Sequence, residues 1–138
     1  MKAQFVVHGE PQGKARHRMT RAGRTYTPAK TVKYEKLVRD EYTAQCWNIW
    51  FDDGTPLTVT IDAYLTIPKS TSKKRLQQMA DKIIRPVKKP DWDNIGKIIC
   101  DSLNGVAYHD DSQIVDGRVR KFYGTEPFVV VTIEEGNT

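Results

Sequence analysis

The sequence predicts a single α/β or α+β domain, spanning residues 1–138, in which helices pack on one mixed β-sheet. Three observations lead to this prediction. The length of 138 residues suits one domain. Residues 57–67 alternate between apolar and polar side chains, which is the period of a half-buried strand. Residues 34–50 carry apolar side chains at steps of three and four, which is the period of an amphipathic helix.

The elements before residue 57 follow from the same periods and from turn residues. Residues 3–8 predict a first strand, and residues 9–28 predict a loop or a loose hairpin, because they hold three Gly and two Pro and no apolar period. Thr27 as the cap and Pro28 as the first helical residue begin the long helix. That helix is expected to end near Phe51, before a turn rich in Asp and Gly.

The second half of the chain predicts two more helices and two more strands. Asp91 is a suitable cap for a second core helix, and Asn104-Gly105 is a suitable end for it. The expected order is a short basic helix at 70–82, an extended basic connection at 83–90, the second core helix at 92–103, and a closing pair of strands at 113–122 and 127–134.

Two cysteines, Cys46 and Cys100, lie in apolar, helix-like stretches without metal-binding spacing around them. We expect them to be reduced thiols in the core of a cytosolic protein. The N-terminal apolar run is too short for a signal peptide, and no stretch approaches the roughly 18 apolar residues of a membrane-spanning helix. The expectation is a soluble, cytoplasmic protein with no membrane partner.

Charge is distributed unevenly along the chain. The sequence has 22 Lys and Arg against 17 Asp and Glu, which gives a net charge of +5. Seven of the cations lie in residues 9–33 and eight in residues 69–90, whereas residues 91–116 contain six Asp and the single cation Lys97. The modest net charge therefore conceals two basic segments and an acidic segment that directly follows the second of them.

A basic surface attracts phosphate groups, whereas clustered Asp residues repel them unless a cation lies between. The charge pattern favours a DNA-binding protein with a metal-dependent site for phosphodiester cleavage, in which carboxylates hold Mg²⁺ and no small-molecule cofactor takes part. The alternative is that the charged runs are solvated faces. The candidate DNA contacts are Lys14, Arg16, Arg18, Arg21, Arg24, Lys73, Lys74, Arg75, Lys88 and Lys89.

The acidic candidates fall at two places. Asp91 and Asp93 enclose the start of the second core helix, where the helix dipole favours ionised carboxylates, although ordinary N-capping explains the same residues. Lys97 lies four residues after Asp93 on the same helical face, either as a surface ion pair or as a contact to the scissile phosphate. Asp110 and Asp111 follow in a turn, where turn chemistry also favours Asp.

The run D-x-D-N-x-x-K at residues 91–97 and the run Y-H-D-D-S-Q-I-V-D at residues 108–116, with Asp101 between them, resemble the motifs of the RusA family of Holliday-junction resolvases. These are small dimeric endonucleases of bacteria and their prophages. The order and size of the other elements agree over nearly the whole chain. The N-terminal loop is longer and more basic than in the best-known member and resembles a phage-type branch, which leaves junction selectivity open.

The resemblance implies a RusA-like homodimer in a bacterial or phage-infected cell. It implies binding of four-way DNA junctions and paired cuts that depend on Mg²⁺, with Mn²⁺ able to substitute, in DNA recombination and repair. The implied site residues are Asp91, Asp93 and Asp111 as metal ligands, Lys97 as the essential lysine, and Asp110 and Asp101 as lesser candidates.

Two alternatives to a junction resolvase stay open. One is a non-catalytic, basic nucleic-acid-binding module whose acids are caps and turn residues, and the other is a metal-dependent nuclease for flaps or forks. Trp47 and Trp50 are expected to pack in the core or at a dimer interface, and Trp92 over the site. His109 is expected to be a turn residue without a catalytic role.

Overall fold

The structure, a computed structural model, describes residues 1–15 and 18–136. Its centre is a four-stranded mixed sheet in the order β1-β6-β4-β5. The strands are β1 (Lys2–His8), β4 (Leu57–Thr66), β5 (Ile114–Gly124) and β6 (Phe128–Glu135). β4 and β5 run parallel, whereas β6 is antiparallel to both β1 and β4. The predicted α+β class with a mixed sheet is confirmed.

The two closing strands do not pair with each other, which corrects the expectation of a closing pair. β4 lies between β5 and β6. The cause is the long connection from β4 to β5, which contains α2 (Lys73–Ala80) and α3 (Trp92–Ser102). A crossover of this length lets β5 lie parallel to β4, and the short turn after β5 then returns the chain across β4 to its far side.

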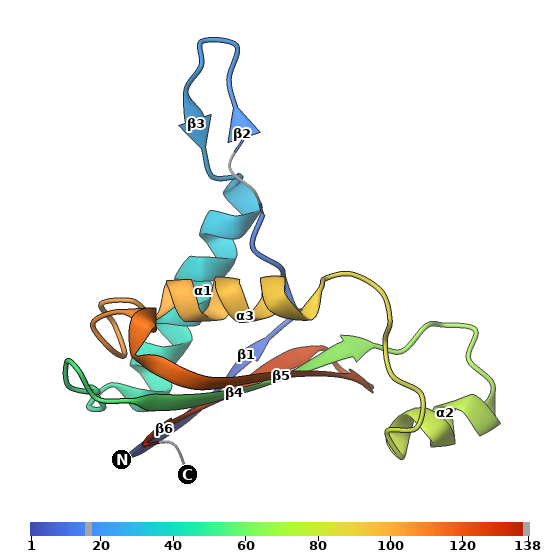
Figure 1. Cartoon of the computed structure of the whole chain (residues 1–138). Coiled ribbons are helices and arrows are strands. Elements are labelled where there is room, and N and C mark those ends of the chain that lie inside the picture. Colours follow the sequence, from blue (N-terminus) through green and yellow to red (C-terminus); the bar gives the residue numbers. More distant parts are fainter. Residues whose placement is uncertain (16–17, 137–138) are drawn as a thin grey trace.

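The hydrophobic core lies between one face of the sheet and the helices α1 (Ala29–Cys46) and α3 (Figure 1). The alternation predicted for β4 is present, because its inward residues are at most 2% exposed and its outward residues are partly exposed. The core residues of the helices include Tyr34, Val38, Tyr42, Ile95, Ile98 and Ile99. The helix α3 is therefore held against the sheet by its apolar face, which leaves its polar face for chemistry.

The helix α1 ends at Cys46, earlier than the predicted end near Phe51, and it begins at Ala29 with Pro28 in the cap position. The Ile49 N–H bonds to the Cys46 carbonyl, and the Tyr42 hydroxyl donates to the Ile49 carbonyl, so the chain turns there. As a result, Trp47 is 78% exposed, and Trp50 is exposed as well. Neither packs in the core, which was one of the two places expected for them.

Two further segments stand apart from the core. β2 (Arg18–Met19) and β3 (Thr25–Tyr26) form a short hairpin that projects beyond the N-terminal end of α1 (Figure 1). This is the loose hairpin expected within residues 9–28. The helix α2 packs beside β5 and is shorter than the predicted 70–82. Within residues 1–15 and 18–136, the helices are too short or too polar to cross a bilayer.

The edge of the sheet formed by β1 is partly closed by a side chain. The Gln45 amide of α1 accepts a hydrogen bond from the Val6 N–H at 3.0 Å and donates one to the Val6 carbonyl at 2.9 Å. It thereby satisfies the backbone groups that an edge strand otherwise leaves open. β5 lies at the opposite edge of the sheet, next to α3.

Candidate active site

Two carboxyl groups meet where the end of α3 approaches the start of β5. Asp101 belongs to the last turn of α3, and Asp111 opens the short 3₁₀ helix η1 (Asp111–Gln113). Their carboxyl groups are close enough to interact. Burial raises the pKa of Asp111, the interaction with Asp101 raises it further, and Lys97 acts in the opposite direction. The sequence made Asp101 a lesser candidate, and the structure places it beside Asp111.

Asp101 also lies between two ammonium groups. Its Oδ2 atom is 3.4 Å from Lys97 Nζ and 3.5 Å from Lys14 Nζ. Lys97 stands one helical turn before Asp101 on the same side of α3, and its side chain is exposed. The structure thus brings Lys97 and Asp111 into one cluster, with Asp101 as the residue that joins them.

Lys14 belongs to the basic N-terminal loop, but its ammonium group forms ion pairs with two carboxylates. Its ammonium lies 2.7 Å from Glu35 Oε2 of α1, and the side chains of Lys14 and Glu35 are only 17% and 15% exposed. Burial acts to lower the pKa of Lys14, but Glu35 and Asp101 outweigh it and the pKa is raised. The sequence predicted a DNA contact for Lys14, whereas the structure engages its ammonium with two carboxylates.

The loop around Lys14 docks directly on the start of α3. The Lys14 N–H bonds to the Asn94 carbonyl at 3.0 Å. A Cβ atom at Gly13 would lie 3.1 Å from the Cβ atoms of both Asn94 and Pro90, so only glycine allows this close approach without displacement. The N-terminal loop is therefore part of the framework around α3.

Asp91 and Asp93 lie at the start of α3, as predicted. Asp91 is the N-cap residue, although its side chain makes no cap hydrogen bond, and Asp93 accepts one from the Asn94 N–H. Asp93, with Trp92, lines a groove of about 230 Å³ between α3 and β5. Trp92 is exposed.

Asp93 and Asp101 stand at opposite ends of α3, eight residues or about 12 Å of helix axis apart, with Lys97 midway. Within residues 1–15 and 18–136, the side chains of His, Cys, Asp and Glu form no group of three or more close enough to hold a metal ion. The structure thus brings Asp111 to Asp101, but it does not assemble Asp91, Asp93 and Asp111 into one three-ligand group.

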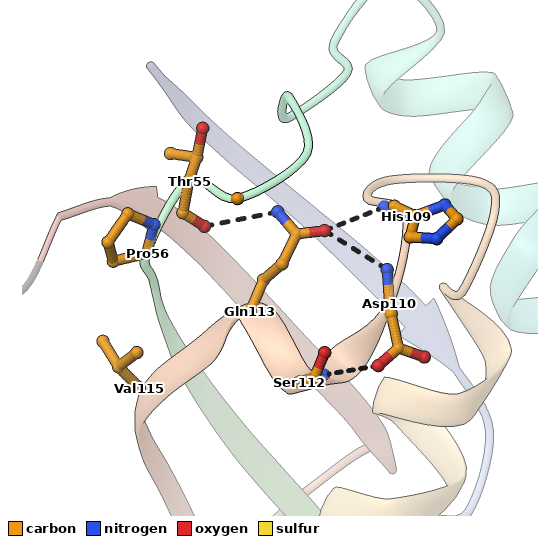
Figure 2. Close-up of a pocket in the computed structure, with 8 residues that line it drawn as sticks. Thr55, Pro56, His109, Asp110, Ser112, Gln113 and Val115 are labelled. Carbon is orange, nitrogen blue, oxygen red and sulfur yellow. Dashed lines mark hydrogen bonds between the residues drawn. The ribbon is translucent and has the colours of Figure 1, made fainter.

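The turn that carries Asp110 and Asp111 is fixed by hydrogen bonds (Figure 2). The Ser112 N–H donates to the Asp110 carboxylate, and bonding by Ser112 holds the pKa of Asp110 below its usual range. The side chain of Gln113 reaches across this turn to the loop before β4. Sequence reasoning gave Gln113 no role, although it lies within the quoted motif.

The sequence-predicted DNA contacts lie on three segments. Lys73, Lys74 and Arg75 form the exposed first turn of α2, and Arg21 and Arg24 lie exposed in the projecting hairpin. Lys88 and Lys89 are exposed in the connection before α3. Arg16 and the side chain of Arg18 fall outside the described residues.

Three further cations gather on one aromatic ring of β5. Lys82 Nζ lies 4.6 Å from the ring centre of Phe122, the Arg85 guanidinium 4.4 Å and the Arg120 guanidinium 5.7 Å. Arg120 also pairs with Asp62 through two hydrogen bonds of 2.6 and 2.8 Å. The connection at 82–89 is thereby fixed against β5, and it extends the basic surface from α2 toward α3.

The two cysteines are free, as predicted for reduced thiols. Cys46 is buried in the core, and burial raises its pKa. Burial also raises the pKa of Cys100 to about 12, so its thiol stays protonated at neutral pH. Neither thiol is suited to act as a nucleophile or a metal ligand in this state.

Comparison with known proteins shows the family of the chain. The model of the family described as endodeoxyribonuclease RusA matches residues 8–134. The chain belongs to the RusA family. The uncharacterized protein YqaN of Bacillus subtilis (strain 168) is 37% identical over 139 residues, which cover 95% of this chain and 94% of that protein.

Membership in the RusA family makes the chain a DNA-binding nuclease that acts on branched DNA. It also indicates a divalent metal cofactor. The match includes both acidic runs and both basic segments, so the cluster around Asp101 and Asp111 falls within the matched residues.

The carboxylates of this RusA-family site are chemically suited to a hard divalent cation. Mg²⁺ commonly takes one or two protein carboxylates and completes its shell with water and substrate phosphate oxygens. Asp101 and Asp111 provide such a pair at one end of α3, and Asp91 and Asp93 provide exposed carboxylates at the other. The donors therefore fit a metal that is completed by substrate, without forming a cage of protein ligands alone.

Proposed function

We propose that this RusA-family protein is a Mg²⁺-dependent endodeoxyribonuclease that resolves four-way DNA junctions in recombination and repair. The observation that supports the proposal is the exposed ammonium of Lys97 beside the carboxyl pair Asp101–Asp111. Two basic segments of the same domain attract the phosphate backbone of DNA to the protein.

The proposed roles follow the chemistry of each side chain. Asp91 and Asp93 offer carboxylates to Mg²⁺, or to Mn²⁺ in its place, at one end of α3, and Asp111 together with Asp101 offers them at the other. When bound, the metal supplies charge neutralisation at the phosphate and lowers the pKa of bound water. Lys97 contacts the scissile phosphate, because its ammonium is exposed and is oriented by Asp101. Asp101 thus serves both the lysine and the neighbouring carboxylate.

The basic segments are proposed to hold the arms of the junction. The hairpin β2–β3 and the first turn of α2 both project from the body of the domain, on either side of α3 (Figure 1). Cations at such projections reach phosphates that lie away from the cut site. Symmetric cutting of a junction requires two sites, and we therefore propose a homodimer.

The deciding experiment compares variants on a labelled four-way junction with Mg²⁺. Asp93→Asn and Asp111→Asn are expected to bind the junction but to cut it at least about 100-fold more slowly, because each loses a metal-binding charge. Asp40→Asn is the matched control, since Asp40 forms an exposed surface pair with Lys36. Cutting at the wild-type rate by both site variants would remove the proposed site.

Additional substrates separate the alternatives. A linear duplex, a flap and a fork are cut in parallel with the junction. Faster cutting of flaps or forks would assign the nuclease to those substrates, and binding without cutting of any substrate would favour a non-catalytic module. Sedimentation at the concentrations of the assay tests the homodimer.

A further inference from the structure

Gln113 connects the turn that carries Asp111 to the rest of the domain. It is the last residue of η1, directly before β5. Its side chain lies between two loops, the turn at 109–111 and the loop at 52–55 that leads into β4 (Figure 2). These loops are far apart in the sequence, and this single side chain bonds to both.

The Gln113 amide uses its full hydrogen-bonding capacity. Its oxygen accepts from the N–H groups of His109 at 3.1 Å and Asp110 at 3.2 Å. Its nitrogen donates to the carbonyls of Asp52 at 2.9 Å and Thr55 at 3.2 Å. An amide has two donor hydrogens and two acceptor positions, so none is left over. Every partner is a backbone group, which means that the amide fixes the path of both loops.

The contacts demand this residue type. The two N–H groups of the 109–111 turn require an acceptor, and the two carbonyls of the 52–55 loop require a donor. A glutamate has the same length but no donor, and a leucine has neither donor nor acceptor. Asparagine is shorter by one methylene group and does not span the same gap. The side chain therefore holds the two loops together, with its oxygen toward the 109–111 turn and its nitrogen toward the 52–55 loop.

The bonds of Gln113 fix the backbone next to Asp111, because they join Asp110, just before it, to Gln113, two residues after it. Asp110, before it, is bonded to the Gln113 oxygen, and the Gln113 N–H bonds back to the Asp110 carbonyl. The Asp111 carboxyl group interacts with Asp101 of α3, which belongs to a different layer of the fold. The direction of the Asp111 carboxylate is thus set by the turn, and the turn is set by Gln113.

We infer that Gln113 is a positioning residue for Asp111, which it holds against Asp101 and Lys97 by tying the 109–111 turn to the 52–55 loop. This inference rests on the proposed function, because it needs Asp111 in the reaction. Gln113 itself touches neither the carboxyl pair nor Lys97 through any of its four bonds. Its effect is on geometry, and small displacements of a reacting group lower a rate steeply.

The test uses Gln113→Leu and Gln113→Glu in the full chain, with the four-way junction and Mg²⁺. Both variants are expected to lower kcat by about 10- to 100-fold, while the KM for the junction stays close to the wild-type value. Amide hydrogen exchange at His109 and Asp110 is expected to become faster, because both N–H groups lose their acceptor in Gln113→Leu. Titration calorimetry with Mg²⁺ alone is expected to show weaker binding in Gln113→Leu, which changes no charge.

Gln45→Leu is the matched control. Gln45 also bonds to backbone groups through its side-chain amide, but it does so at β1, the opposite edge of the sheet from β5. Its variant is expected to lose a comparable amount of stability and to keep the wild-type kcat. An equal loss of kcat in Gln45→Leu would assign the effect to stability alone and would overturn the inference.

The remaining outcomes separate this inference from the proposed function. If Asp111→Asn is inactive while both Gln113 variants cut at the wild-type rate, the positioning role is overturned and the proposed function stands. If Asp111→Asn still cuts at the wild-type rate, the role of Asp111 fails, and the positioning role fails with it. Should Gln113→Leu fail to fold, Gln113→Met decides, because it keeps the length of the side chain, carries no charge and removes the amide donors and acceptor.

Discussion

Lys14 Nζ lies 3.5 Å from Asp101 Oδ2, although the two residues come from opposite halves of the chain. The same ammonium bonds to Glu35, so one side chain joins the N-terminal loop, α1 and α3. Through Asp101, this connection reaches one member of the carboxyl pair of the candidate site. The stability of the fold and the order of the site therefore depend on a shared residue.

Replacing Lys14 by Met is expected to destabilise the protein by about 1–3 kcal/mol, because Glu35 and Asp101 lose a charged hydrogen-bond partner in a part-buried place. Urea unfolding measures the difference. Lys36→Met is the matched control, since the exposed pair between Lys36 and Asp40 is expected to contribute less than about 0.5 kcal/mol. An equal loss of unfolding free energy in the two variants would show that the part-buried ion pairs of Lys14 stabilise the fold no more than an exposed pair does.

The Asp111→Asn variant is expected to be more stable than the wild type at neutral pH. Burial and Asp101 raise the pKa of Asp111 in the folded state, so the folded protein binds this proton more tightly than the unfolded chain does. The wild type therefore loses stability as pH rises from the unfolded pKa of about 3.9 through the higher folded value. Asparagine does not ionise and avoids that loss.

Thermal melts of wild type and Asp111→Asn between acid and neutral pH test the sign. The difference in Tm in favour of the variant is expected at pH 7 and should shrink below the unfolded pKa, where Asp111 is protonated in both states. A difference that is the same at both ends of the pH range would show that ionisation of Asp111 is not its cause.

Replacing both Lys74 and Arg75 by Ala is expected to weaken binding of the four-way junction and to reduce its dependence on salt. Both side chains lie in the exposed first turn of α2. The slope of log K against log salt should become shallower by about one for each phosphate that the variant no longer neutralises. Fluorescence anisotropy in the absence of divalent metal measures the slope. Lys2→Ala, at the opposite edge of the sheet, should leave it unchanged.

Neither cysteine is expected to react with a thiol reagent in the native protein at pH 8. Burial raises the pKa of both thiols, that of Cys100 to about 12, so the reactive thiolate is scarce. Labelling with iodoacetamide, followed by mass spectrometry, is expected to modify both residues only after urea is added. Rapid native labelling of Cys100 would place it in a more open environment than the groove beside α3.

Much of the fold follows from local pattern alone. The alternation along β4, the apolar face of α3 and the turn residues around Gly54 and Gly105 predicted elements that the structure contains. The end of α1 did not follow, because Ile49 and Trp50 continue the apolar spacing beyond Cys46. The hydrogen bond from Tyr42 to the Ile49 carbonyl turns the chain there, and no local pattern encodes that contact.

The candidate site was only partly predicted, because it too depends on contacts between distant parts of the chain. Charge and motif pointed to Asp91, Asp93, Lys97 and Asp111, but the spacing of residues along a chain does not fix distances between elements. The contact between Asp101 and Asp111 depends on how β5 lies beneath α3, which only the tertiary structure determines. Gln113 has a neutral side chain among charged residues, and its bonds are all to backbone groups, so composition gave no signal for it.

The position of β6 has a consequence for how the protein is made. This strand is the last element of the sheet in sequence, yet it lies between β1 and β4 and pairs with both. During synthesis, the edges of β1 and β4 that face it remain unpaired until residues 128–135 have left the ribosome. The nuclease therefore completes its sheet late, by pairing distant parts of the chain, and is expected to fold more slowly than a helical domain of its size.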